Sequence, residues 1–175
     1  MKVVHVAGMG LWALSVSGLA VAAAPTDPQI AQIVVTADQV DIDAGKLAES
    51  RGSSKGVKEF AQLMIRDHTG VSKSAVDLVT RLHVTPEANA TAAGLQKGGD
   101  ENLAALKKLS GAAFDKAYVD HEVAYHEAVI DAIDKTLIPS SQNAELKALL
   151  VKVRPAFGAH LEHAKQLQAS LAKRG

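Results

Sequence analysis

The sequence predicts an all-helical domain, and three observations support this. Residues that favour helices, chiefly alanine, leucine, lysine and glutamate, dominate a chain of 175 residues that is 47% hydrophobic. Apolar side chains recur at spacings of three and four, the period of a helix that buries one face, whereas the alternation typical of strands is nearly absent. Four such stretches, separated by turn signals, predict a four-helix bundle that forms a single domain at residues 27–173.

The first two predicted helices are joined by a short turn. Asp27 can cap the first helix and Pro28 suits its first position, so this helix is expected to run from there to about residue 50. Gly52 and neighbouring serines predict a turn at residues 50–54. The second helix is expected from residue 54 to about residue 83, where Thr85 and Pro86 end it.

The second half of the chain contains the third and fourth helices. Residues 87–99 are mostly small and polar and predict a crossover loop, after which Asp100 can cap a short helix that ends at Leu109. Ser110 and Gly111 break the chain before a third long helix at 112–137. The fourth helix is expected at 141–173, with a kink at Pro155.

Connections that are short, long and short predict the topology of the bundle. A four-helix bundle with a long crossover between its second and third helices is a ferritin-like arrangement. Assembly as a coiled coil is the alternative. The crossover and the small residues on the apolar faces favour the bundle.

The first 23 residues predict a secretory signal peptide. Lys2 precedes an apolar run at 11–21, and small residues follow at 22–24. Cleavage after Ala22 or Ala23 fits this pattern. A retained membrane anchor is the alternative, although the run is short for a span of about 20 residues. We therefore expect a periplasmic or secreted protein without a transmembrane span in the mature chain, in possible association with the outer membrane.

Composition and missing motifs exclude several classes of function. The 19 basic residues balance 19 acidic ones, whereas a nucleic-acid-binding protein normally has a basic surplus. Without cysteine the chain has no disulfide, iron–sulfur cluster or thiol nucleophile. It also lacks a nucleophile elbow, a phosphate-binding loop and the Glu-x-x-His pairs of di-iron bundles. These absences favour a binding or structural protein over an enzyme.

Each predicted helix has one polar residue within its apolar face. These residues are Asp41, His68, His126 and His160. Burying them costs free energy unless they hydrogen-bond one another or bind an ion, so we expect a shared polar centre. Glu122 lies one turn before His126 on the same face and extends the set. Imidazole with carboxylate suits a transition metal such as zinc, copper or iron better than calcium.

Helix register predicts that these residues form two layers. Counted from the turn near Ser140, His126 is about 14 residues away and His160 about 20, an offset of roughly 8 Å at 1.5 Å per residue. Asp41 and His68 show a similar mismatch. A single mononuclear site is therefore not expected from this count. His121 is five residues from His126 and diverges from it, unlike the zinc-protease pair, whose spacing is four.

Several short motifs resemble a known family. They are Phe60-Ala61, Met64-Ile65, Asp67-His68-Thr69, Ser110-Gly111, Phe114-Asp115, Tyr118, His126-Glu127 and His160-Leu161-Glu162. Across residues 32–167 the chain resembles the bacterial "domain of unknown function 4142" family. The resemblance implies a ferritin-like bundle of an exported or outer-membrane protein with no established activity. The recurrent histidines of the family correspond to His68, His126 and His160, whereas Asp41 and Asp43 stand where the family usually has glutamates.

Two hypotheses about function follow. In the first, the protein binds a transition metal ion through His68, His126 and His160, with Asp41 or Glu122 as the carboxylate ligand. In the second, the same residues form a metal-free hydrogen-bonded network in a structural or stress-related periplasmic interaction protein. An oxidase or peroxidase is disfavoured because carboxylates are few. The sequence does not specify a protein partner or a homo-oligomer.

Overall fold

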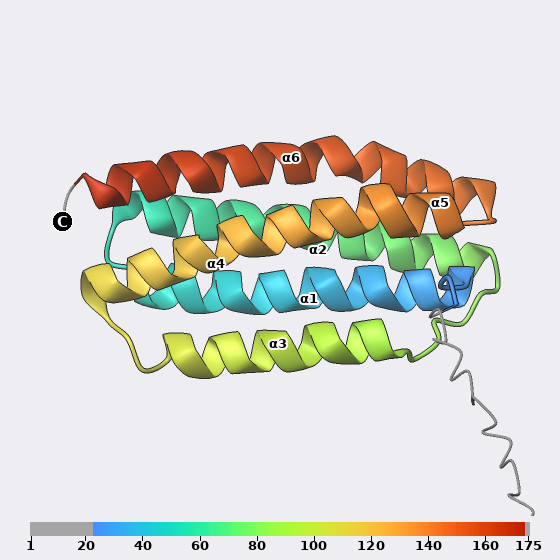
Figure 1. Cartoon of the computed structure of the whole chain (residues 1–175), viewed down its shortest axis with the longest axis horizontal. Coiled ribbons are helices and arrows are strands. Elements are labelled where there is room, and N and C mark those ends of the chain that lie inside the picture. The colour runs from blue at the N-terminus through green and yellow to red at the C-terminus, as the bar shows by residue number, and fades with distance from the viewer. Residues whose placement is uncertain (1–22, 174–175) are drawn as a thin grey trace, which may run out of the picture.

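The computed structural model describes residues 23–173, and all regular structure within them is helical (Figure 1). The prediction of an all-helical fold is confirmed. All but the last residue of the predicted signal peptide at 1–23 lies outside the described residues. The elements in chain order are α1 (Asp27–Arg51), α2 (Lys55–Arg81), α3 (Ala90–Leu106), α4 (Gly111–Ala132), the π-helical η1 (Ile133–Leu137), α5 (Ile138–Ser140) and α6 (Ala144–Ala172).

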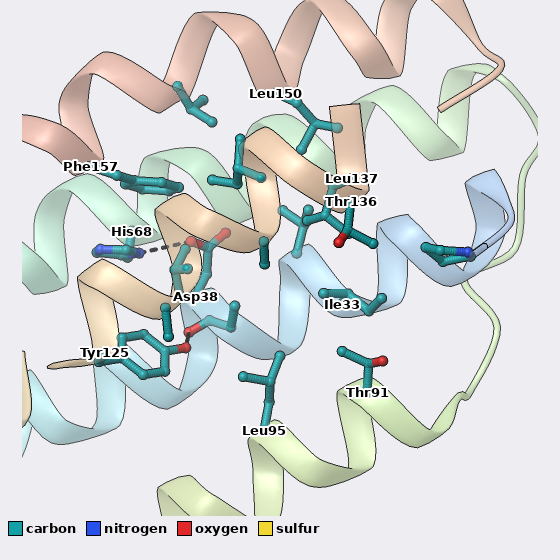
Figure 2. Close-up of a pocket in the computed structure, with 18 of the residues that line it drawn as sticks. Ile33, Asp38, His68, Thr91, Leu95, Tyr125, Thr136, Leu137, Leu150 and Phe157 are labelled. Carbon is teal, nitrogen blue, oxygen red and sulfur yellow. Dashed lines mark hydrogen bonds and ion pairs between the residues drawn. The ribbon is translucent and has the colours of Figure 1, made fainter. Parts of the chain in front are cut away.

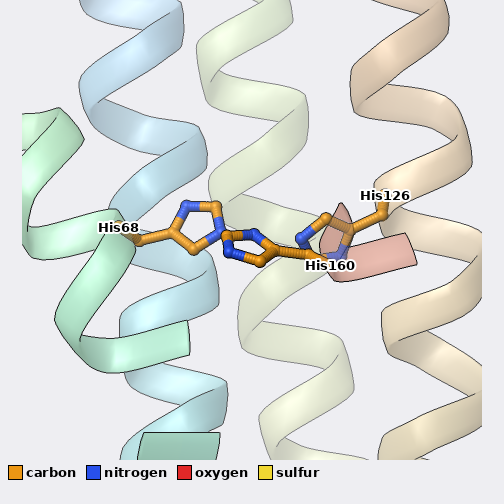
Figure 3. Close-up of side chains that lie close together, drawn as sticks. All are labelled: His68, His126 and His160. Atoms are coloured by element: carbon orange, nitrogen blue, oxygen red, sulfur yellow. The ribbon is translucent and has the colours of Figure 1, made fainter. Parts of the chain in front are cut away.

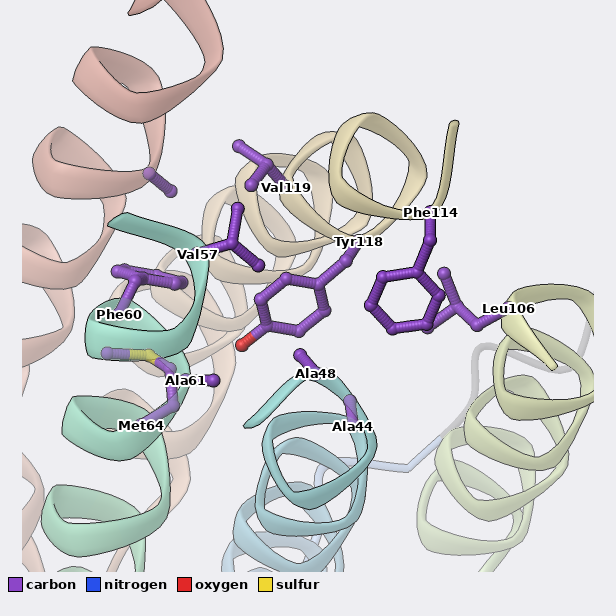
Figure 4. Close-up of a cluster of buried hydrophobic side chains, with 11 residues drawn as sticks. Ala44, Ala48, Val57, Phe60, Ala61, Met64, Leu106, Phe114, Tyr118 and Val119 are labelled. Atoms are coloured by element: carbon purple, nitrogen blue, oxygen red, sulfur yellow. The ribbon is translucent and has the colours of Figure 1, made fainter. Parts of the chain in front are cut away.

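Four long helices, α1, α2, α4 and α6, pack along one another, and α3 lies on the outside against α1 (Figure 1). Their buried side chains form two apolar clusters at different levels of the bundle. One cluster includes Phe60, Phe114 and Tyr118 (Figure 4), and the other includes Ile30 and Leu150. The polar residues picked out from the sequence lie between these two levels.

The start of α1 differs by one residue from the prediction that Asp27 caps it. Thr26 is the cap: its side chain accepts a hydrogen bond from the Gln29 backbone N–H, and the Gln29 side chain accepts one from the Thr26 N–H. Asp27 instead accepts hydrogen bonds from the backbone N–H groups of Gln142 and Asn143. This carboxylate therefore ties the beginning of α1 to the beginning of α6.

The predictions of a crossover loop at 87–99 and a short helix from Asp100 to Leu109 were wrong. Residues 90–106 form the continuous helix α3, capped by Asn89, whose side chain accepts from the Ala92 N–H. The small residues in this segment permit close packing: a Cβ on Gly99 would meet Val40 of α1 at 2.8 Å. Alanine and glycine make the buried and exposed faces of this helix similar in polarity. The helical spacing of apolar residues was therefore not evident in the sequence of this segment.

The predicted third helix at 112–137 is interrupted near its end. Regular α-helix ends at Ala132 and gives way to the π-helical turn η1, followed by the short α5. The next helix, α6, begins at Ala144 because the Asn143 side chain accepts from the N–H groups of Glu145 and Leu146. Pro155 lies within α6. Among the described helices none is long and apolar enough to span a membrane.

Candidate metal centre

The polar residues predicted from the sequence come together in the middle of the bundle. Asp41 comes from α1, His68 from α2, Glu122 and His126 from α4, and His160 from α6, and each is at most 3% exposed. We refer to these five residues as the polar centre. Figure 3 shows the three imidazole rings converging from three helices, with ring centroids 5.4–5.6 Å apart. One nitrogen from each ring lies within 4.8 Å of the other two.

The expectation of two separate layers was wrong, because it counted loop residues as helical rise. His126 lies 14 residues before Ser140, the end of α5, and His160 lies 16 residues after Ala144, the start of α6. The offset is then only about 3 Å at 1.5 Å per residue. Side chains tilt toward the N-terminus of their own helix. Because His126 and His160 lie on antiparallel helices, their side chains lean toward each other, and this tilt compensates for the remaining offset.

A second group of ligand atoms adjoins the three histidines. Asp41, Glu122 and His126 also each offer one atom within 4.8 Å of the others. Asp41 Oδ2 lies 3.0 Å from His68 Nε2 and 3.5 Å from His126 Nε2, and Glu122 Oε2 lies 3.5 Å from His126 Nδ1. The polar centre therefore consists of two overlapping triads that share His126.

In each histidine, one of the two ring nitrogens forms a hydrogen bond to an oxygen atom, and this bond orients the ring. His126 Nδ1 donates to the Glu122 backbone carbonyl at 3.0 Å, and because a carbonyl only accepts, this nitrogen carries the hydrogen. In the same way His68 Nδ1 donates to Asp38 Oδ1 at 2.8 Å, and His160 Nε2 to Asp67 Oδ2 at 3.0 Å. Metal-binding histidines are typically held in this way, which leaves the second nitrogen directed at the ion.

The second nitrogen of each ring is buried without a hydrogen-bond partner. These atoms are His68 Nε2, His126 Nε2 and His160 Nδ1. Both carboxylate oxygens of Asp41 and Oε2 of Glu122 are in the same state, since the 3.0 Å approach of Asp41 to His68 lacks hydrogen-bond alignment. Buried polar atoms are normally paired, so an unpaired group of this size calls for a cation or ordered water.

The charges of the polar centre follow from burial and proximity. Burial alone would lower the pKa of His68, but the carboxylates of Asp41 and Asp38 raise it to about 10. Burial lowers the pKa of His126 to about 4 and also lowers that of His160. Burial, with Asp41 nearby, raises the pKa of Glu122 well above its usual value. At neutral pH the metal-free centre thus holds a charged His68, an ionised Asp41 and two neutral imidazoles, and the carboxyl group of Glu122 resists ionisation.

Sequence reasoning missed the two carboxylates that orient histidines, Asp38 and Asp67. Asp38 precedes Asp41 by three residues on the same side of α1, and Asp67 is adjacent to His68, so spacing marked them as neighbours of the polar centre. Their role was not evident because it depends on contacts between helices, Asp38 with His68 and Asp67 with His160. Phe157 stacks on the other side of His68, with ring centroids 5.0 Å apart and nearly parallel planes.

His121 and His163 lie outside the cluster, and for His121 this agrees with its spacing of five residues from His126. The His121 ring stacks on Tyr125 of its own helix. His163 is exposed and packs edge-on against Phe60.

Comparisons with curated proteins and with solved structures gave no match. A comparison with protein families matched the one described as "Domain of unknown function (DUF4142)" over residues 16–167. This span contains every residue of the polar centre, all of α1, α2 and α4 and most of α6, which agrees with the resemblance seen in the short motifs. The chain belongs to the DUF4142 family.

Proposed function

We propose that this protein is an exported, ferritin-like four-helix-bundle protein that binds one transition metal ion through His68, His126 and His160. The observation that supports the proposal is the convergence of three buried imidazole nitrogens without hydrogen-bond partners, each on a ring whose other nitrogen is already held by an oxygen. Once His68 gives up its second proton, all three nitrogens present electron pairs toward one another, and a metal ion can accept them.

The dimensions of the cluster suit a single ion. An ion about 2.1 Å from each nitrogen in a tetrahedron holds those nitrogens about 3.4 Å apart. The nitrogens lie within 4.8 Å of one another, so small rotations of the side chains would bring them to that spacing. One ion, rather than a carboxylate-bridged pair, therefore fits the donor set.

Asp41 fits the role of fourth ligand better than Glu122. Asp41 Oδ2 lies close to nitrogens of both His68 and His126. Burial would raise the pKa of Asp41, but the surrounding histidines, chiefly His68, together lower it. Burial and nearby Asp41 raise the pKa of Glu122 well above its usual value, so this carboxyl group gives up its proton less readily than Asp41. Three neutral imidazoles and one carboxylate suit zinc, copper or iron, and the ion would take the place of the proton that His68 carries in the metal-free protein.

A metal-free structural or stress-related interaction protein is the second candidate. His68 bridges Asp38 and Asp41, which lie on the neighbouring helix α1, and this charged contact links α1 to α2 without an ion. In this case the histidines serve stability alone, and added metal has no effect.

Metal analysis of protein purified without an affinity tag distinguishes the two. We expect one equivalent of zinc, copper or iron, or its uptake by metal-free protein with a rise in melting temperature. His126→Asn should abolish this uptake, whereas His83→Asn should leave it unchanged. His83 is exposed at the end of α2 with a positive φ that asparagine tolerates. Absence of stoichiometric metal, with no shift in melting temperature on adding any of the three ions, contradicts the metal proposal.

Export is tested separately by N-terminal sequencing of protein from the periplasmic fraction. We expect the mature chain to begin at Ala23 or Ala24. Recovery of an intact N-terminus in the membrane fraction would instead indicate a retained anchor.

A further inference from the structure

A cavity of about 410 Å³ lies beside the polar centre, between α1, α3, α6 and the end of α4 with η1 (Figure 2). Its volume is within the range of small-molecule sites, about 300–1,000 Å³. The space is partly open at the surface, so a ligand can enter it from solvent. Its walls are mainly aliphatic and aromatic and include Ile33, Val34, Leu95, Leu137, Leu150 and Phe157.

The cavity has an exposed end and a buried end. Thr91 and Thr136 are exposed, whereas Asp38 and His68 at the other end are buried. Figure 2 shows His68 and Asp38 at one side of the pocket, with Phe157 beside His68, and Thr91 and Thr136 at the other side, near Ile33 and Leu137. A molecule that enters past the threonines therefore meets apolar walls and, at the buried side, a carboxylate.

Most polar groups at the buried end are already engaged. The Tyr125 O–H donates to the Ala37 carbonyl at 2.8 Å, and His68 Nδ1 donates to Asp38 Oδ1. The second oxygen of that carboxylate, Asp38 Oδ2, is buried with no hydrogen-bond partner, on a residue that is 2% exposed. This oxygen accepts hydrogen bonds and donates none, so it recognises a donor.

The backbone around the cavity is also irregular. Ile133, Thr136 and Leu137 of the π-helical turn η1 line it. Single π-helical turns inserted after an α-helix are frequent at functional sites, because they displace side chains from regular packing. The irregular turn therefore contributes three of the residues that line the cavity.

We propose that this cavity binds an apolar small molecule with a single hydrogen-bond-donating head group, of the class of a medium-chain alcohol. The chain lies against the aliphatic wall and the hydroxyl donates to Asp38 Oδ2. Water is a poor occupant because the apolar walls offer it few of the two to four partners it needs. The inference stands apart from metal binding, since it uses the carboxylate oxygen that His68 does not contact.

Calorimetric titration of the metal-free protein with decanol tests the site. We expect saturable binding of one molecule, and about tenfold weaker binding of the matching decyl methyl ether, which has the same chain but no donor. Decanoate should also bind more weakly than decanol because Asp38 repels its carboxylate. Absence of saturable decanol binding, equal binding of the ether, or tighter binding of decanoate would each overturn the proposal.

A cavity-filling variant and a matched control locate the binding. Ala132→Phe places a ring in the cavity, because Ala132 lines it, and should weaken decanol binding at least about tenfold. Ala124→Phe makes the same change at an exposed position of the same helix and should leave binding unchanged. Leu95→Phe on α3 repeats the test if Ala132→Phe loses its helical circular dichroism. Unchanged binding in a folded cavity variant would contradict the assignment.

Metal uptake by these variants should match that of the unmodified protein, which separates this test from that of the metal site.

Discussion

At the residue scale, His68 is the most strongly perturbed group of the polar centre. It lies between two carboxylates on α1 and stacks on Phe157, and its pKa is raised to about 10 from an ordinary value of 6.5. A raised pKa means that the folded protein holds this proton more tightly than the unfolded chain does. Its contribution to stability is therefore complete below pH 6.5 and is lost as the pH rises toward 10.

We expect the melting temperature of the metal-free protein to fall between pH 6.5 and pH 10, and the change His68→Gln to flatten that fall. His126 and Asp38 titrate at lower pH than this window, and burial raises the pKa of Tyr118 and Tyr125 well above 10. Burial also raises the pKa of Glu122, but Glu122 is present in both proteins, so the difference between the two slopes reports His68. Thermal melts in the presence of a chelator measure the slope. His83→Asn serves as the control and should retain it, and an unaltered slope in His68→Gln would show that His68 is not the charged group.

The ligand-type residues of the centre could be predicted from the sequence, but their partners could not. His68, His126 and His160 interrupt apolar faces, and that pattern exists within each helix by itself. Asp38 and Asp67 matter only because they meet a histidine on another helix. Asp67 also lies on the partly exposed side of α2, where spacing alone suggests an ordinary surface charge.

At the element scale, α3 shows how a helix of small residues packs. It covers α1 through a close approach at Gly99, where a Cβ would meet the branched Val40 side chain at 2.8 and 2.9 Å. Neighbouring Gly98 has nothing within 4 Å of the corresponding position. Two adjacent glycines of one helix thus face opposite environments.

The paired changes Gly98→Ala and Gly99→Ala should have opposite effects on stability. Gly98→Ala should raise the free energy of unfolding by up to about 1 kcal/mol, through helix propensity alone. Gly99→Ala should lower it by about 1–3 kcal/mol despite the same gain in propensity, because Val40 is β-branched and cannot easily move aside. Urea denaturation of both variants checks this. A stabilising Gly99→Ala would mean that α3 does not pack closely on α1.

At this scale the sequence predicted the long, strongly amphipathic helices well. It failed where the two faces of a helix differ little in polarity. The helix α2 carries its apolar residues on one face and was predicted to within two residues at each end. The residues of α3 were assigned to a loop followed by a short helix, because alanine and glycine show no clear face until they meet a neighbour. The π-helical turn η1 also had no sequence signal, since its residues continue the apolar pattern of α4.

At the scale of the whole molecule, the polar centre connects the four long helices. Its five residues come from α1, α2, α4 and α6, and α3 contributes none of them. An ion bound there would join helices that otherwise meet through two separate apolar clusters. Ligands that bind only the folded state stabilise it by mass action.

We expect metal binding to slow hydrogen exchange in the middle of α2, α4 and α6 more than in α3. The ion would suppress openings that separate its ligands, whereas local fraying of α3 against α1 leaves the ligands in place. Exchange measured by mass spectrometry with and without zinc, on the unmodified protein and on His126→Asn, checks this. Equal protection of all helices, or protection that persists in His126→Asn, would contradict a site that joins these helices.

The sequence by itself determined the all-helical class, four of the amphipathic helices and the histidines and carboxylates that interrupt them, because each of these is a local property of spacing and composition. The tertiary structure decided that the interruptions meet at one level, because this depends on the path of the loops and on side chains that tilt toward each other from antiparallel helices. It also decided which oxygen holds each imidazole and where the apolar cavity opens. These features arise between helices, so no single stretch of sequence contains them.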